Sequence, residues 1–288
     1  MSLGKSIRIY LEGGDVTGVR YAEVVNWTGQ AVVLPRSRLA ELAAWSNALK
    51  RPGVYFLVGA ERPMNREVYI GESETVADRL QQHIDKEFWQ EAIVITSKDE
   101  NLTKSHIKYL ESRLIELAKA AGRYSLQNGN QPSLTGLPRP DRDAMEEFLG
   151  HLRLLLGALG HRLLEPLLDA SPANSKSAVT KQLSFSVRQA LANAMITDEG
   201  IVVLKGSTAL SQINRSLGNY ASLRDELTAS GKLVAQDNNV LVFQDDVLFT
   251  SPSAAAAIIS GSSTNGRTAW HDAEGRTLKE LEEAQANA

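Results

Sequence analysis

The sequence predicts an α+β protein: a small antiparallel sheet flanked by helices, with an N-terminal β annex and a separate α+β C-terminal module. Two observations lead to this prediction. Residues 53–59 and 67–71 are rich in apolar, β-prone side chains and are joined by a short polar loop, which is typical of an antiparallel strand pair. Residues 99–121 repeat apolar side chains at helical spacing, and Gly122 stands where a helix commonly ends.

Short β-prone segments precede the strand pair. We expect strands over 6–11, 20–25 and 31–34, followed by a helix over 37–50. The apolar stripe of that helix consists of Leu39, Leu42, Trp45 and Leu49. The sequence Arg51-Pro52-Gly53 should end it, since proline and glycine both disfavour a continued helix.

Further elements are expected around the long helix. A helix over 76–84 and a strand over 92–96 should precede it. An amphipathic helical region over 145–168 should follow it, with a break at Gly157 or Gly160.

The C-terminal part mixes strands and helices. The expected elements are strands near 183–188, 200–205 and 240–243 and a helix near 221–230. One more helix has both ends marked in the sequence: Ser251 can cap it, Pro252 suits its first turn, and Gly261 can end it.

A chain of 288 residues is longer than one typical domain. The segment Ala170–Lys181, rich in Ser, Ala and Asn, is the best linker candidate. The expected division is an annex with its helix over 1–50, a central domain over 51–140, a helical connector and linker over 141–182, and an accessory module over 183–288.

Composition limits the function classes. The 31 basic and 34 acidic residues give a net charge of −3, so any DNA contact must use a local basic patch. The chain has no cysteine, which excludes disulfides and Cys-ligated zinc and fits a reducing compartment. The first residues lack the apolar core of a signal peptide, and the apolar stretch 149–168 is too polar to span a bilayer. We therefore expect a cytoplasmic protein that does not enter the membrane.

A small set of polar residues stands out between positions 53 and 130. Its members are Tyr55 and Tyr69 on neighbouring strands, Arg79 and His83 on one helical face, Glu111 on the long helix, and Asn128 and Asn130 in a loop. Taken singly, each has an ordinary structural explanation, such as packing, a solvated helix face or a turn.

The order of these residues is more specific than any one of them. The order of motifs is Gly53-Val54-Tyr55, then Tyr69-Ile70-Gly71, then Glu72-Ser73 with Arg79 and His83 after it, then Glu111 and an asparagine loop. This order resembles the catalytic domain of the GIY-YIG nucleases over residues of about 50 to 132. The first motif departs from the family pattern by one conservative change, Val54 in place of isoleucine. The pattern covers a little over a quarter of the chain.

The resemblance implies metal-dependent hydrolysis of DNA phosphodiester bonds. Glu111 would hold a single divalent cation, Mg²⁺ or Mn²⁺, an arrangement that suits Mg²⁺ because this ion keeps most of its waters. Arg79 would place its guanidinium against the scissile phosphate. Asn128 would close the pattern, with Asn130 as an equal candidate by spacing.

The general base is left open by the sequence. The resemblance gives Tyr55 the task of orienting or deprotonating the attacking water, with Tyr69 assisting. A free phenol titrates near 10, so His83, with a reference pKa of about 6.5, is a rival proton acceptor.

The C-terminal part resembles a module that accompanies nucleases and methylase-linked proteins of bacterial restriction systems. The resemblance lies in residues 198–207, the Ser251 helix, Asn265-Gly266-Arg267 and Trp270. In a functional interpretation Lys205, Ser251, Arg267 and Trp270 share in DNA contact. In the alternative, Ser251 caps a helix and Trp270 packs in the core.

The leading hypothesis is a bacterial DNA endonuclease serving defence or restriction. A structure-specific repair nuclease would use the same residues. The alternative from another class is an inactive GIY-YIG scaffold that binds nucleic acid or a partner, although the intact set from Tyr55 to Glu111 argues against a decayed site. Cutting both strands would favour a homodimer, and the C-terminal module could bind a partner protein.

Overall fold

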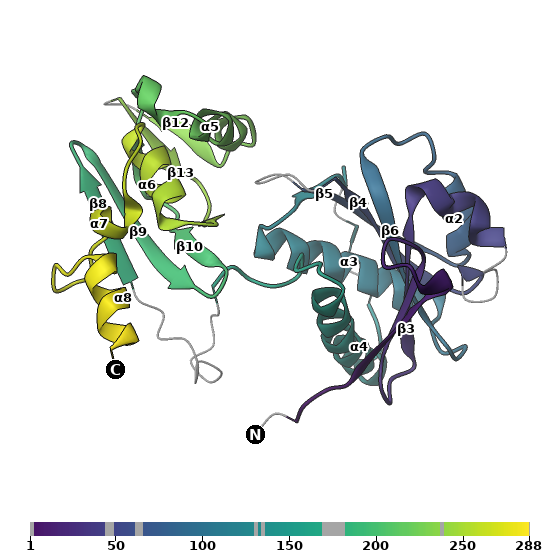
Figure 1. Cartoon of the computed structure of the whole chain (residues 1–288). Coiled ribbons are helices and arrows are strands. Elements are labelled where there is room, and N and C mark those ends of the chain that lie inside the picture. The colour runs from purple at the N-terminus through teal and green to yellow at the C-terminus, as the bar shows by residue number, and fades with distance from the viewer. Residues whose placement is uncertain are drawn as a thin grey trace. The chain divides into compact units, whose positions relative to one another are not determined.

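The computed structural model describes residues 3–43, 49–60, 66–129, 132–133, 136–168, 182–236 and 239–287. The chain forms two compact units, Met1–Pro166 and Leu167–Ala288 (Figure 1). The predicted α+β class is confirmed. The predicted linker, together with the other residues of 169–181, lies outside the described residues.

The first unit is built on one seven-stranded sheet, in the order β1-β2-β3-β6-β4-β5-β7. Its strands are β1 (Ile7–Leu11), β2 (Arg20–Val24), β3 (Gly29–Pro35), β4 (Gly53–Gly59), β5 (Glu67–Ser73), β6 (Trp89–Ser97) and β7 (Ser125–Leu126). Its helical segments are η1 (Glu12–Gly14), η2 (Arg36–Ala43), α2 (Val76–Gln81), α3 (Lys104–Ala121) and α4 (Arg139–Ala158). All strand pairs are antiparallel except β5 with β7.

Helices cover the two faces of this sheet differently. Leu110 and Leu114 of α3 and Leu152 of α4 pack in one core cluster with Val54 and Ile70, and Figure 1 shows α3 and α4 beside the sheet. On the other face, side chains of α2 form a second cluster with alternate residues of β4, β6 and β3. Alternation along each strand therefore separates the two clusters.

The annex expected over residues 1–50 extends the central sheet. Strand β3 pairs with β6 from Gly29↔Ser97 to Pro35↔Glu91, which makes β1, β2 and β3 continuous with the strands of the central domain. The small sheet predicted from sequence is therefore larger than expected. The predicted helix over 37–50 is also wrong in its first part, because Arg36–Ala43 is a 3₁₀ helix. Residues 44–48 lie outside the described part of the chain.

The long helix begins later than the periodicity predicted. Asp99 accepts hydrogen bonds from Ser97 and Asn101 in a turn, and Thr103 then caps the helix by accepting from the amide of His106. Such local side-chain bonds compete with helix formation before the cap. At the other end Gly122 adopts the left-handed conformation, with φ 65°, as predicted.

The amphipathic region after α3 is shorter and starts earlier than predicted. Helix α4 runs over Arg139–Ala158, and Gly160 follows with φ 90°. The predicted interruption near Gly160 is thus confirmed. The residues that follow, Leu163 and Leu164, are buried in the same core as α4 without continuing the helix.

The second unit contains two sheets. Strands β8 (Gln182–Val187), β9 (Ala190–Thr197), β10 (Gly200–Val203) and β14 (Val247–Phe249) form the first, and β11 (Thr208–Leu210), β12 (Leu233–Gln236) and β13 (Val240–Phe243) form the second. The helices are η3 (Arg215–Leu217), α5 (Tyr220–Ala229), α6 (Pro252–Ser260), α7 (Gly266–Ala269) and α8 (Leu278–Ala286). Among the described residues, no helix combines the length and apolar character needed to cross a bilayer.

Candidate active site

The register of β4 and β5 brings the two tyrosines together. Tyr55 lies opposite Gly71, and Leu57 lies opposite Tyr69. The two tyrosines therefore point to the same face as diagonal neighbours, with ring centroids 6.2 Å apart. A Cβ atom on Gly71 would come within 2.4 Å of the Tyr55 hydroxyl, so the Tyr55 ring needs a glycine at this position.

Helix α2 and the turn after it cover this tyrosine pair. His83 is buried, and its Nε2 lies 2.8 Å from the hydroxyl of Tyr55, which is itself fully buried. Tyr69 is only half-buried, and its ring centroid lies 5.2 Å from that of His83. The ammonium of Lys86 lies 4.1 Å from the centre of the Tyr69 ring. Tyr69 is thus the phenol closer to solvent.

Burial sets the protonation of the Tyr55–His83 pair. It raises the pKa of Tyr55, an effect to which neighbouring Tyr69 adds and which Arg79 opposes. Burial, together with the nearby cations Lys86 and Arg79, lowers the pKa of His83 to about 4. At neutral pH the imidazole is therefore neutral and can accept the hydrogen bond that the Tyr55 hydroxyl donates.

Arg79 lies at the exposed end of this cluster. Its Nη1 donates to Gln82 Oε1 at 2.6 Å, and its hydrogen bond to the phenol of Tyr55 raises the pKa of the guanidinium. Because the side chain is exposed, its fork of donors is accessible to an incoming anion. The predicted common helical face of Arg79 and His83 is not present, because α2 ends at Gln81 and His83 lies in the turn that follows.

Glu111 reaches the site from the opposite side of the sheet. Helix α3 packs against the face that does not carry Tyr55, yet the half-buried Glu111 carboxylate accepts a hydrogen bond from the main-chain amide of Glu72. Burial, aided by the Glu72 carboxylate, raises the pKa of Glu111 to about 7, and Lys104 and Arg79 oppose this shift. Arg79 is thus a common neighbour of Glu111 and Tyr55.

The edge of β5 beyond its short pairing with β7 explains how residues from both faces converge. Alternate residues of an antiparallel strand turn their main-chain groups to the same edge. Along this edge Val68 O accepts from Gln127 N at 2.8 Å, Ile70 bonds to Asn128, and the Glu72 amide bonds to Glu111. The end of β5 is therefore the point around which the site is assembled.

Asn128 acts on this edge like a residue of a paired strand. Its Oδ1 accepts from Ile70 N at 3.1 Å, and its Nδ2 donates to Ile70 O at 2.7 Å. These two bonds hold the middle residue of the Tyr69-Ile70-Gly71 motif, so the geometry gives Asn128 a positioning role. Asn130, the other predicted candidate, lies outside the described residues.

Two charged neighbours were not among the predicted site residues. Lys86 contacts Tyr69, and Glu72, whose carboxylate pairs with Lys104 at 2.9 Å, lies beside Glu111. Sequence signals existed for both. Lys86 follows His83 at a spacing of three, and Glu72 directly follows Gly71.

The donor set near Glu111 fits a hard divalent cation. Within the described ranges no three His, Cys, Asp or Glu side chains gather in a metal-binding group. Mg²⁺ does not need such a group, because one or two carboxylates with water and substrate oxygens suffice. Glu111, with Glu72 beside it, can supply these carboxylates. Burial and the Glu72 carboxylate raise the pKa of Glu111, and a cation bound there would favour the charged carboxylate and so lower that pKa.

Comparison with known proteins identifies one part of the chain. Residues 183–282 match the family model of a domain of unknown function, DUF4357. The match lies within the second unit. No curated protein and no solved structure matches the chain.

In the DUF4357 segment, the residues considered for DNA contact have structural tasks. Ser251 Oγ accepts from the amide of Ala254 at 3.1 Å and caps α6. Trp270 is fully buried, and its Nε1 donates to Pro252 O at 3.1 Å. The alternative interpretation, a helix cap and a core tryptophan, is confirmed for these two residues.

The two basic candidates of the DUF4357 segment are exposed. Arg267 pairs with Glu282 at 2.6 Å. The main-chain amide of Lys205 donates to Asp246 at 2.8 Å. Neither contact assigns a DNA-binding role to its side chain.

Proposed function

We propose that the first unit is a metal-dependent DNA endonuclease of the GIY-YIG type. The observation that supports this most strongly is the buried pair of Tyr55 and His83, 2.8 Å apart, beside the exposed Arg79. The charge of Arg79 also acts to lower the pKa of both Tyr55 and Glu111. Phosphodiester hydrolysis needs a phosphate-binding cation, a proton acceptor and a carboxylate that holds a metal at one place. These three groups are neighbours here.

Arg79 is the proposed phosphate-binding residue. Its planar guanidinium can donate two parallel hydrogen bonds to phosphate oxygens, which a lysine cannot do. The same side chain is close enough to the Tyr55 phenol for each to shift the pKa of the other. A phosphate that draws Arg79 outward would therefore also uncover the Tyr55 hydroxyl.

The proposed proton path runs from the attacking water to Tyr55 and on to His83. Because burial raises the pKa of Tyr55, a lasting phenolate is unfavourable. The neutral His83 imidazole, 2.8 Å away, can take the phenolic proton as the phenol takes one from water. Tyr55 and His83 would thus act as one unit, with Tyr69 orienting the water from the more exposed position.

Glu111, beside Glu72, would hold the divalent cation, Mg²⁺ or Mn²⁺. When bound, the cation supplies positive charge to the phosphate and the leaving oxygen. Lys104, which pairs with Glu72, offsets part of the negative charge of these two carboxylates.

The biological setting that we propose is bacterial defence or restriction in the cytoplasm. It rests on the second unit, whose sequence resembles modules that accompany restriction-type nucleases, and on the absence of cysteine in the chain. The DUF4357 match itself carries no activity.

The test is a cleavage assay with Mg²⁺, Mn²⁺ or EDTA on plasmid, linear, single-stranded, branched and modified DNA. Wild type should cut at least one of these substrates with metal and none with EDTA. Glu111→Gln, nearly equal in size, should abolish cutting and leave DNA binding in place. Glu116→Gln is the matched control, because Glu116 is an exposed glutamate on the same helix.

Two results would contradict the proposal. Cutting by Glu111→Gln at the wild-type rate would remove the metal-binding assignment. Binding of DNA by wild type without cleavage of any substrate under any metal would favour the inactive scaffold instead.

A further inference from the structure

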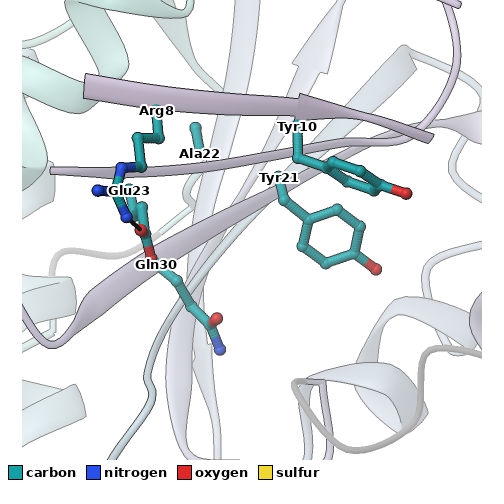
Figure 2. Close-up of a pocket in the computed structure, with 6 residues that line it drawn as sticks. All are labelled: Arg8, Tyr10, Tyr21, Ala22, Glu23 and Gln30. Atoms are coloured by element: carbon teal, nitrogen blue, oxygen red, sulfur yellow. Dashed lines mark ion pairs between the residues drawn. The ribbon is translucent and has the colours of Figure 1, made fainter. Parts of the chain in front are cut away.

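A second polar site lies at the far end of the sheet, on strands β1, β2 and β3. A pocket of about 320 Å³ is lined by Arg8, Tyr10, Tyr21, Ala22, Glu23 and Gln30. Figure 2 shows the rings of Tyr10 and Tyr21 together on one side, with Arg8, Glu23 and Gln30 on the other. The proposed nuclease function makes no use of these residues.

The strand register connects this pocket with the catalytic tyrosines. Tyr10 lies opposite Tyr21, Tyr21 opposite Val32, Val32 opposite Val94, and Val94 opposite Tyr55. Directly opposed residues point to the same face of a sheet. The pocket tyrosines and Tyr55 therefore share one face. Neighbouring strands lie about 4.8 Å apart, so four steps place Tyr10 roughly 19 Å from Tyr55.

Val32, Val94 and Tyr55 are buried in the core cluster of this face, so a continuous substrate would pass over the side chains that cover them. Each DNA strand advances about 3.4 Å per nucleotide in a stacked duplex, so roughly 19 Å corresponds to a span of several nucleotides. A strand that enters the catalytic site could therefore place a flanking nucleotide at the pocket.

The aromatic side of the pocket has the properties of a stacking surface. Tyr10 is 65% exposed, an unusual fraction for a large aromatic residue on a strand. Its ring centroid lies 6.2 Å from that of Tyr21, at an interplanar angle of 52°. Tyr21 is partly buried against the core cluster of this face, and this packing holds the Tyr10–Tyr21 pair in place. Exposed tyrosines on a sheet bind bases by stacking, whatever the base sequence.

The polar side of the pocket favours an anion beside the base. Glu23 is neutralised by Lys98 at 2.8 Å and is also 3.7 Å from Arg8. The three side chains together carry a net positive charge, and the Arg8 side chain is 73% exposed. The amide of Gln30, which donates to Thr96 at 3.2 Å, adds a polar group for a base edge.

We propose that this pocket holds an unpaired base of the DNA strand that enters the catalytic site, with Tyr10 stacking on the base and Arg8 contacting its phosphate. The inference rests on the proposed nuclease function and narrows its substrate to DNA with single-stranded character beside the cut. A fully paired base would not expose its ring face to Tyr10.

The experiment measures fluorescence anisotropy of a labelled single-stranded oligonucleotide, and of a blunt duplex of the same sequence, in EDTA so that nothing is cut. Tyr10→Ala should bind the single strand roughly fivefold to a hundredfold more weakly, since a stacking contact has this effect. Tyr10→Phe keeps the ring and should bind like wild type. Duplex binding should be unchanged in all variants.

The matched control is Ile9→Ala. Ile9 is the neighbouring residue on β1, is 46% exposed and points to the opposite face of the strand. Thermal melts of Ile9→Ala and Tyr10→Ala should agree, which would exclude a folding defect. Arg8→Gln should reduce the slope of log affinity against log salt by about 0.7, the value for one phosphate contact on a single strand.

Equal single-strand binding by Tyr10→Ala and Ile9→Ala would overturn the inference. The experiment distinguishes failure of this inference from failure of the nuclease proposal. If wild type cuts DNA and Tyr10→Ala binds normally, the pocket assignment alone is wrong. If no DNA is cut but single-strand binding depends on Tyr10, the pocket assignment stands and the nuclease proposal is wrong.

Discussion

The two units of the chain use their buried polar side chains differently. In the first unit, Tyr55, His83 and Glu111 contact one another or share the neighbour Arg79, and burial shifts the pKa of each. In the second unit, the buried Arg224 donates to the main-chain carbonyls of Leu210 and Ile258. A buried side chain that bonds to main-chain groups stabilises the fold. Ionisable side chains that shift the pKa of one another are typical of a site that transfers protons or binds anions.

After the loss of cutting expected for Glu111→Gln, the largest effect should come from Arg79. Arg79→Ala should lower the rate of DNA cleavage about a hundredfold to a thousandfold, as loss of one group that stabilises transition-state charge does. Arg79→Lys keeps the charge without the fork and should recover only part of the rate. Single-turnover kinetics measures this change. Arg139→Ala, at an exposed arginine, is the control and should cut normally.

Arg224 tests whether the buried charge of the second unit is structural. Arg224→Met keeps the length of the side chain but leaves two carbonyls without a donor, so the free energy of unfolding should fall by about 2–4 kcal/mol. Urea denaturation measures it, with exposed Arg215→Met as control. An unchanged unfolding midpoint would contradict this structural role. The nuclease reaction of the folded variant should be unaffected.

His83 should make the first unit sensitive to acid. Its pKa is about 4 in the folded protein and near 6.5 when unfolded. As the pH falls below about 6.5, the unfolded chain binds a proton at this histidine before the folded protein does. The contribution of the neutral His83 to the free energy of unfolding is therefore fully present above about pH 6.5 and is lost as the pH falls toward 4. The difference between the folded and unfolded pKa of His83 corresponds to a loss of about 3 kcal/mol of unfolding free energy at most.

The matching variant is His83→Asn, which cannot titrate in this range. Denaturation midpoints measured from pH 7 to pH 4 should fall less steeply for the variant than for wild type. The two curves having the same slope would show that other groups cause the acid sensitivity. Because the variant weakens the contact with Tyr55, its stability at pH 7 should be lower than that of wild type.

The smallest effect concerns the cap of α6. Ser251→Ala removes the acceptor for the Ala254 amide and should cost about 1 kcal/mol of unfolding free energy, with no change in DNA binding. Exposed Ser186→Ala is the control. A large loss of DNA affinity in Ser251→Ala, without a loss of stability, would return Ser251 to the DNA-contact interpretation.

Much of the fold followed from local patterns. The strand pair β4 and β5, the C-terminal end of α3 and both ends of α6 were predicted within a few residues, because apolar alternation, a capping serine and left-handed glycines act locally. Strand β9 was not predicted, since its sequence ALANAMIT has no aromatic residue and carries its β-branched residues, Ile196 and Thr197, only at its end.

The candidate site was predictable only as a set of residues. The motif order singled out Tyr55, Tyr69, Arg79, His83 and Glu111, but the helical face expected for Arg79 and His83 is wrong because α2 ends before His83. The pairing of β3 with β6, which joins the annex pocket to the face of Tyr55, depends on contacts 56 to 68 residues apart. No local pattern encodes such a pairing.

Local chemistry was enough to establish many of the strands and helices and where several of them end. The three-dimensional arrangement was needed for the rest. The neutral His83, the raised pKa of Glu111 and the meeting of two sheet faces at the end of β5 arise from burial and from distances between remote residues. Desolvation and Coulomb interactions depend on those distances in space and not on separation along the chain.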